Sequence, residues 1–345
     1  MTNQKQFSTS YTKSWALVIG IDRYKNDSLP PLETAESGAA TLVEFLIKEM
    51  NFPADHIILL TGQQATKAVI ESVVEDHLTD PNRVGKDDRL LIYYAGHGIT
   101  RARTTMGSVG YIAPYDAEQG LWSTFIEMDE FIKQAAFMSA KHVLFLLDAC
   151  FSGLALMRGQ GSNEPHEEFL RRSARQIITA GTADQMISDR LLGEGHSIFT
   201  YFLLRGLRGQ AANDGVLRAS HLGMYLQDQV SGYTHGQQIP QVGRLVGDGG
   251  GDFIFKVISA ETKRPAPRPA DLDHTRLRPG VLRKDEYEQT LVDRPVQMNY
   301  HIAATEPTVQ TRIAYDSERA TLLRPPSRAN RAKRRRLFAK LAGFW

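Results

Sequence analysis

Short apolar runs and amphipathic segments alternate along the first 258 residues. The runs have the length and the branched residues of buried strands, and they cover residues 16–21, 56–60, 88–95, 143–147, 176–180 and 253–257. Between them, apolar residues recur every three or four positions, as at Ala35, Leu42 and Leu46, which predicts helices. Residues 128–138 and 197–207 are predicted helices as well. Strands that alternate with helices predict right-handed crossovers and a three-layer α/β/α sandwich with a mostly parallel central sheet.

Polar positions mark the connections between these elements. Thr66 and Ser220 stand before apolar-periodic segments and are predicted N-caps. Residues 101–114 are expected to form a flexible stretch, followed by a small hairpin before the helix at 128. Residues 158–175 are polar, contain Gly, Asn and Pro, and show little apolar periodicity. We expect them to form an exposed loop.

Two of the predicted strands end in residues that carry chemistry. Cys150, the only cysteine, follows the run 143–147, and His97 stands between two glycines after the run 88–95. Taken singly, a lone cysteine is usually a buried structural residue and a lone histidine a loop or packing residue. Parallel strands end at one edge of a sheet, so the two would lie together if their strands are neighbours. A thiol beside a base is then an activated nucleophile.

The motifs YYAGHG (93–98) and DACFSG (148–153) resemble those of the caspase-like cysteine peptidases, close to the metacaspases and short bacterial caspase-like proteins. WALVIGIDRY (15–24) resembles the family's first strand, and HSIFTYFLLRGLRG (196–209) part of its C-terminal half. Cys150 follows His97 by 53 positions, which is near the spacing of about 50 found in caspases. The resemblance covers roughly residues 12–258.

This resemblance implies a Cys-His dyad. Cys150 attacks a peptide carbonyl, and His97 protonates the leaving amine. Backbone N–H groups of Gly98 and Cys150 are the expected oxyanion donors, because developing negative charge needs fixed dipoles. The alternative is a caspase-like scaffold whose site is inactive.

Asp148 is the expected substrate-binding residue of the specificity pocket. It lies two positions before Cys150 and so on the same side of a regular strand, where a carboxylate would pair with Arg or Lys at P1, the residue before the cleaved bond. The chain has Gly38 where metacaspases usually carry a second pocket Asp, and Asp22 and Glu36 are the candidates to substitute for it. Residues 26–38 contain no Lys or Arg, which argues against P1 Asp.

Composition and charge change after residue 258. Four prolines lie between Pro265 and Pro279, which is typical of an extended linker. Residues 259–345 have 18 basic and 10 acidic residues, a net charge of about +8, against about −6 for residues 1–258. We expect a flexible N-terminus (1–13), a peptidase domain (14–258), and a linker with a basic tail or small module (259–345). The tail could contact an anionic partner, either nucleic acid or a membrane surface.

Self-processing is expected at basic residues that lie in exposed, unstructured segments. Arg171, Arg172 and Arg175 in the predicted loop are the first candidate self-cleavage sites. Pro265 disfavours cleavage directly after Arg264. Protein substrates and a regulatory protein are the expected partners.

The remaining expectations concern cofactors and location. No Cys/His cluster has zinc spacing, so the sequence requires no cofactor; the resemblance allows calcium, which some metacaspases use. A single cysteine excludes an internal disulfide, and the N-terminus lacks a signal-peptide pattern. These features favour the reducing cytoplasm.

Overall fold

The computed structural model describes residues 11–102, 107–151, 166–182, 195–213 and 216–257. At its centre is a six-stranded sheet with the order β10-β8-β7-β3-β1-β2. The strands are β1 Ser14–Gly20, β2 Ile57–Thr61, β3 Arg89–Ala95, β7 His142–Phe151, β8 Ala174–Thr182 and β10 Gln241–Arg244. All are parallel except β10, which runs antiparallel to β8.

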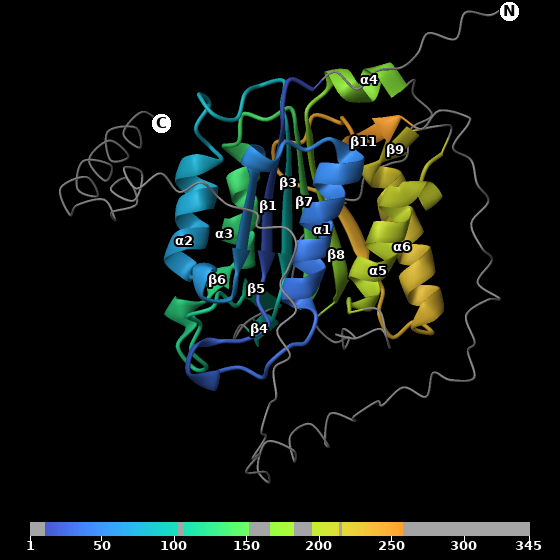
Figure 1. The fold of residues 1–345 in the computed structure, drawn as a ribbon. Helices are drawn as coiled ribbons and strands as arrows, with labels where there is room; N and C mark the ends of the chain where they lie inside the picture. The colour runs from blue at the N-terminus through green and yellow to red at the C-terminus, as the bar shows by residue number, and fades with distance from the viewer. Residues whose placement is uncertain (1–10, 103–106, 152–165, 183–194, 214–215, 258–345) are drawn as a thin grey trace, which may run out of the picture. The chain divides into compact units, whose positions relative to one another are not determined.

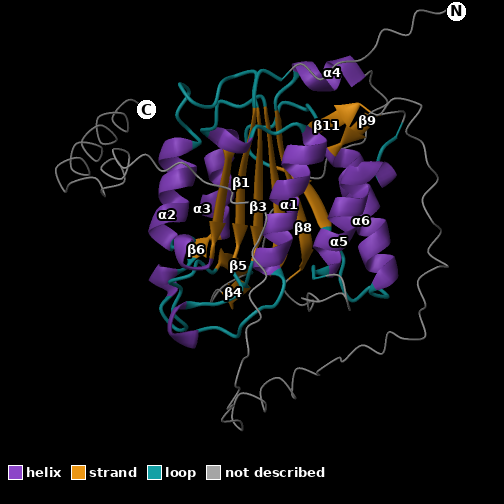
Figure 2. Cartoon of the chain, in the orientation of Figure 1, coloured by secondary structure: helices purple, strands orange, loops and turns teal. Residues whose placement is uncertain are grey.

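Helices cover both faces of this sheet (Figures 1 and 2). One face carries α1 Ala35–Met50, α5 Ile198–Arg205 and α6 Ala219–Tyr233. The other carries α2 Lys67–Ser72 and α3 Met128–Lys133. Side chains alternate along the strands. Leu91 and Tyr93 therefore pack on the face covered by α1, α5 and α6, while Leu90 and Ile92 pack on the face covered by α2 and α3. The expected three-layer sandwich is confirmed.

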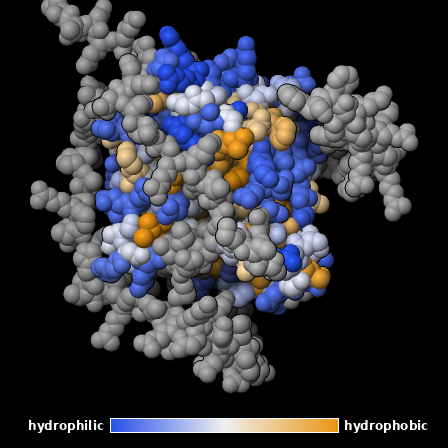
Figure 3. Space-filling view, turned by 180° about the vertical axis from the view of Figure 1, so that it is seen from behind, coloured by the Kyte–Doolittle hydropathy of each residue, from blue (hydrophilic) through white to orange (hydrophobic). Residues whose placement is uncertain are grey.

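Two smaller sheets complete the described fold. β4 Gly98–Ala102, β5 Ser108–Ile112 and β6 Ile126–Glu127 form an antiparallel sheet directly after His97. The hairpin of β4 and β5 thus begins before the position predicted for it and includes residues that were expected to be flexible. β9 Val216–Arg218 pairs with β11 Ile254–Val257. Seen from behind, the described surface is mostly hydrophilic with small hydrophobic areas (Figure 3). No helix within these described ranges has the length and apolar character needed to cross a membrane.

Arg89 is buried at the amino-terminal edge of the sheet, where it holds several elements together. Its guanidinium donates to the carbonyls of Ile254, Phe255 and Met50 at 2.6–3.1 Å, and its Nε donates to Ser14 Oγ at 2.8 Å. Burial lowers the pKa of Arg89 to about 10, so it remains a cation at neutral pH.

Three local predictions need correction. The segment predicted as a loop contains α4 His166–Arg171, and β8 begins at Ala174, while residues 158–165 lie outside the described ranges. The helix predicted over 128–138 ends at Lys133 and continues as one 3₁₀ turn to Ala136. Ser220 is not an N-cap, because α6 begins at Ala219 and the Ser220 hydroxyl donates to Asp252 instead. Thr66 does cap α2, accepting from Val69 N–H at 3.4 Å.

Candidate active site

The backbones of His97 and Cys150 lie at the same edge of the central sheet. β3 and β7 are adjacent parallel strands, and Ala95 is the register partner of Asp148. His97 and Cys150 each follow that pair by two residues, at the carboxyl ends of the strands. The condition on which the sequence argument depended, that the two strands are neighbours, is therefore met. The side chain of Cys150 lies outside the description.

A β-bulge interrupts β7 just before Cys150. Leu147 pairs with Thr179 of β8 and Cys150 with Gly181, so Asp148 and Ala149 oppose the single residue Ala180. Bulges bend a strand and re-aim its side chains, and they are common beside active sites. The prediction that Asp148 and Cys150 face the same side assumed regular alternation. That assumption fails at this bulge.

The imidazole of His97 is oriented by a main-chain carbonyl. Its Nε2 lies 2.7 Å from the carbonyl oxygen of Pro30. A carbonyl only accepts hydrogen bonds, so Nε2 carries the proton and Nδ1 is the basic nitrogen of the neutral ring. Tyr24 stacks obliquely against the ring, with centroids 5.2 Å apart. The backbone thus selects the tautomer of His97.

The register of β4 leaves the Gly98 N–H outside the sheet ladder. Gly98 is paired with Ile112, and Ala113 N–H donates to the His97 carbonyl at 3.0 Å. Because the flanking residues His97 and Ala113 share this hydrogen bond, Gly98 and Ile112 form a non-hydrogen-bonded pair, whose own N–H groups point away from the partner strand. The Gly98 N–H therefore points away from β5, as an oxyanion donor must.

Asp148 is buried, and its neighbours are hydroxyl groups. Its Oδ2 accepts hydrogen bonds from Thr200 Oγ1 of α5 at 2.7 Å and from Ser197 Oγ, the residue before α5, and Tyr93 Oη lies 3.4 Å from the same oxygen. Burial, together with the negative charge of Asp148, raises the pKa of Tyr93 well above its ordinary value. A Cβ on Gly38 would lie 3.5 Å from Thr200 Cγ2 and 3.7 Å from the Tyr93 hydroxyl. Position 38 thus borders this cluster.

Asp22 and Glu36 have structural roles at the start of α1. Asp22 Oδ1 accepts from Ala35 N–H at 2.7 Å and Oδ2 from Glu36 N–H at 3.3 Å. Glu36 Oε1 accepts in return from Asp22 N–H at 3.3 Å. These contacts satisfy N–H groups that a helix start leaves unpaired. They account for both carboxylates without a substrate.

The predicted self-cleavage sites do not lie in extended chain. Arg171 is the last residue of α4, and Arg175 is buried in β8. The Arg175 guanidinium donates to carbonyls of the segment before β7 and of β8 itself, at 2.8–3.0 Å. Arg171 and Arg172 are exposed, but the extended loop that the prediction assumed is replaced here by the end of α4 and the start of β8.

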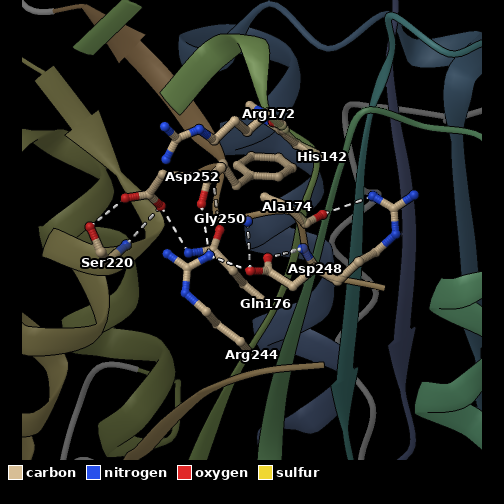
Figure 4. Close-up of polar contacts among 12 residues, drawn as sticks. His142, Arg172, Ala174, Gln176, Ser220, Arg244, Asp248, Gly250 and Asp252 are labelled. Atoms are coloured by element: carbon tan, nitrogen blue, oxygen red, sulfur yellow. Dashed lines mark hydrogen bonds and ion pairs between the residues drawn. The ribbon is translucent and has the colours of Figure 1, made fainter. Parts of the chain in front are cut away.

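The backbone around Arg172 is also covered. Its carbonyl contacts His142 Nε2 at 2.9 Å. Next to it, the carbonyl of Ser173 accepts from Gly249 N–H at 3.0 Å and Gly251 N–H at 2.9 Å. Figure 4 shows Arg172 beside His142 and the segment from Asp248 to Asp252. A Cβ on Gly251 would lie 2.2 Å from the Arg172 carbonyl oxygen, so only glycine allows this close approach. Cleavage here would require local unfolding.

Among the residues that the model describes, no group of three or more His, Cys, Asp or Glu side chains could hold a metal ion. The described site therefore contains no set of ligands that fits calcium. Calcium dependence remains a prediction from resemblance, and no catalytic step below uses the ion.

Sequence reasoning missed the residues that support the site. Tyr24 and Pro30 lie in the segment between β1 and α1, and only their contacts with His97 show their role. Thr200 and Ser197 lie at the start of a helix that reads as apolar. Ser197 had a recognisable signal, because a serine before an apolar helix is a common N-cap.

Comparisons with known proteins identify the family of the chain. The caspase domain model matches residues 13–245. A probable protease from a Desulfuromonadales bacterium is 28% identical over 154 residues, which are 40% of this chain and 18% of that protein. The match thus spans less than a fifth of that relative's length.

Two solved structures are also similar. A protein from Geobacter sulfurreducens, GSU0716, has a TM-score of 0.47 at 17% identity, with 67% of this chain and 92% of that chain covered. Caspase-1 from Spodoptera frugiperda has a TM-score of 0.47 at 13% identity, with 75% and 96% covered. The family assignment rests on the sequence match, which covers more than half of the chain. The chain belongs to the caspase family of peptidases.

Proposed function

We propose that this protein is a cysteine endopeptidase in which His97 and Cys150 form the catalytic dyad. The observation that carries the proposal is the register of β3 and β7, which brings both residues to one sheet edge, two positions beyond the Ala95–Asp148 pair. Membership of the caspase family supports it, as does the similarity to a probable protease.

In the proposed reaction, His97 Nδ1 takes the thiol proton and the Cys150 thiolate attacks the peptide carbonyl carbon. The oxyanion is stabilised by the N–H groups of Gly98 and Cys150. The C–N bond breaks as imidazolium protonates the leaving amine, which leaves an acyl-enzyme. His97 then removes a proton from water, whose attack releases the carboxylic acid and the free thiol. The Pro30 carbonyl stabilises the imidazolium, because it accepts from Nε2 throughout.

The proposed substrates have Arg or Lys at P1. Asp148 supports this preference, because a buried carboxylate at the same sheet edge would form charge-assisted hydrogen bonds with a cationic side chain. A substrate lacking the charge would leave the buried carboxylate without that partner, which is the basis of discrimination.

The test uses fluorogenic peptide amides that differ only at P1, as Arg, Lys, Asp or Ala, with and without calcium. The wild type is compared with Cys150→Ala and His97→Ala, and intact mass is recorded for each to detect self-processing. We expect turnover of the Arg and Lys peptides by the wild type alone. Substantial turnover by either variant would remove that residue from its role, and efficient cleavage after Asp would exclude the proposed specificity.

The proposal extends to compartment and partners. A working thiolate suits a reducing compartment, so we place the enzyme in the cytoplasm. The net charge of about +8 over residues 259–345 supports binding of this segment to an anionic partner. Retention of the full chain on heparin that falls steeply with salt would support this part of the proposal; elution at low salt would contradict it.

A further inference from the structure

Three hydroxyl groups converge on one oxygen of Asp148. Thr200 donates to Oδ2 at 2.7 Å, Ser197 donates to the same atom, and Tyr93 approaches it at 3.4 Å. Thr200 and Tyr93 are completely buried, and Ser197 is 6% exposed. Nothing in the catalytic steps above requires these three side chains.

The direction of each proton follows from the acceptor. A carboxylate can only accept, so the single proton of Thr200 goes to Asp148. In its 2.7 Å contact with Thr200 Oγ1, the Tyr93 hydroxyl must then be the donor. The raised pKa of Tyr93 keeps that proton in place. The result is a directed chain from Tyr93 to Thr200 to Asp148.

Ser197 connects this chain to the start of α5. Its Oγ accepts from Thr200 N–H at 2.9 Å, which caps the helix, while its proton goes to Asp148. The amino-terminal end of α5, with the positive end of the helix dipole, therefore lies at the Asp148 carboxylate. The side chain of Asp148 is thus bonded to residues at the start of α5, whereas its backbone lies in the bulge of β7.

We propose that Ser197 and Thr200 are positioning residues that fix the Asp148 carboxylate for a P1 Arg or Lys side chain. This inference rests on the proposed function, which assigns Asp148 to that side chain. The physical reason is that a charge-assisted hydrogen bond depends on orientation, and a carboxylate on a bulged strand needs partners to fix its rotamer. Loss of one hydroxyl should weaken binding of a cationic P1 residue and leave a neutral one unaffected.

The experiment measures binding without turnover, in the full chain carrying Cys150→Ala. Calorimetry gives Kd for two peptides that differ only at P1, arginine and its neutral isostere citrulline. Thr200→Val keeps the shape and removes the donor, Thr200→Ser restores it, and Thr41→Val makes the same change on α1, where the hydroxyl bonds the Ser37 carbonyl. We expect Thr200→Val to weaken binding of the Arg peptide about tenfold, with the citrulline peptide unchanged and binding restored by Thr200→Ser.

Two results would overturn the inference. One is an equal loss for both peptides, which indicates a purely structural hydroxyl; the other is a Thr200→Ser variant that binds no better than Thr200→Val. If Thr200→Val does not fold, Ser197→Ala and Ser197→Thr make the same comparison at the other donor. Asp148→Asn distinguishes failure of the proposed P1 specificity from failure of the positioning role. If Asp148→Asn leaves the preference for Arg unchanged, the proposed specificity is wrong. If it abolishes the preference while Thr200→Val does not, only the positioning role is wrong.

Discussion

The hydroxyl oxygen of Tyr24 accepts a hydrogen bond from the backbone N–H of His97 at 2.8 Å. Tyr94 approaches the same turn, and its hydroxyl donates to the His97 carbonyl at 2.9 Å. A Cβ on Gly96 would lie 2.6 Å from the Tyr94 hydroxyl and 3.1 Å from that of Tyr24. Glycine at position 96 therefore allows the Tyr24 and Tyr94 hydroxyls to contact the His97 backbone together.

Tyr24→Phe should lower kcat about fivefold with little change in KM. The variant loses one hydrogen bond to the His97 backbone, a loss of about 1 kcal/mol, while the ring contact remains. Steady-state kinetics with a P1 Arg peptide checks this. Tyr225→Phe is the control, because it removes a hydroxyl that donates to Gln210 on the helical face of the sheet. An unchanged kcat would show that Tyr24 does not position the loop.

Asp22→Ala should destabilise the fold without altering P1 preference. Asp22 caps the start of α1 through the N–H groups of Ala35 and Glu36, and loss of such a cap costs about 1 kcal/mol. Urea unfolding measures the first effect, and the ratio of kcat/KM for Arg and Ala peptides measures the second. Asp228→Ala removes an exposed carboxylate from α6 as a control. A shift in the ratio for Asp22→Ala would return Asp22 to the specificity pocket.

Gly38→Ala should stabilise the protein by up to about 1 kcal/mol. Its Cβ would make ordinary contacts at 3.5 Å, and alanine favours the helical conformation of α1. Gly20→Ala is the matched opposite, because there the Cβ would lie 2.5 Å from the Ala35 carbonyl oxygen. We expect the melting temperature to rise for the first variant and to fall for the second. A fall for Gly38→Ala would mean that the Asp148 cluster tolerates no added atom.

His142 should make stability depend on pH below neutrality. It is buried between the Tyr11 hydroxyl and the Arg172 carbonyl, near Lys141 and Arg175, and burial lowers its pKa to about 4 from 6.5. Between these values the unfolded chain takes up a proton that the folded chain does not. Stability is therefore complete above pH 6.5 and is lost as pH falls toward 4, by about 3 kcal/mol in all.

Urea unfolding at pH 7, 5.5 and 4 checks this prediction. Carboxylates titrate in the same range, so the informative quantity is the difference between the wild type and His142→Gln, which has no titrating side chain but can donate to the Arg172 carbonyl. We expect a shallower pH dependence for His142→Gln. His235→Asn, at an exposed turn, should keep the full dependence; equal slopes for wild type and His142→Gln would contradict the assignment.

The sequence predicted the elements that depend on local apolar pattern, because a short buried apolar run has few structures other than a strand open to it. Buried runs such as 88–95 and 143–147, alternating with helices, predicted parallel strands, and the register of the sheet shows that these two strands are adjacent. The bulge at Asp148 and Ala149 was not predictable, because it depends on how β7 pairs with β8 rather than on local composition. The burial of Arg175 was also not predictable from local sequence. A charged residue is expected at the surface, but main-chain carbonyls take the place of water around this guanidinium.

The contacts of Arg89 and Arg175 tolerate substitution of the residues that surround these two arginines. Both cations lie at the edge of the sheet opposite His97 and Cys150, and nearly all of their acceptors are main-chain oxygens, which every amino acid supplies. Replacing Met50, Met138 or Lys141 changes a side chain but leaves the carbonyl in place. The two arginines should therefore persist through sequence drift while the residues around them change, and related chains should show invariant arginines among divergent neighbours.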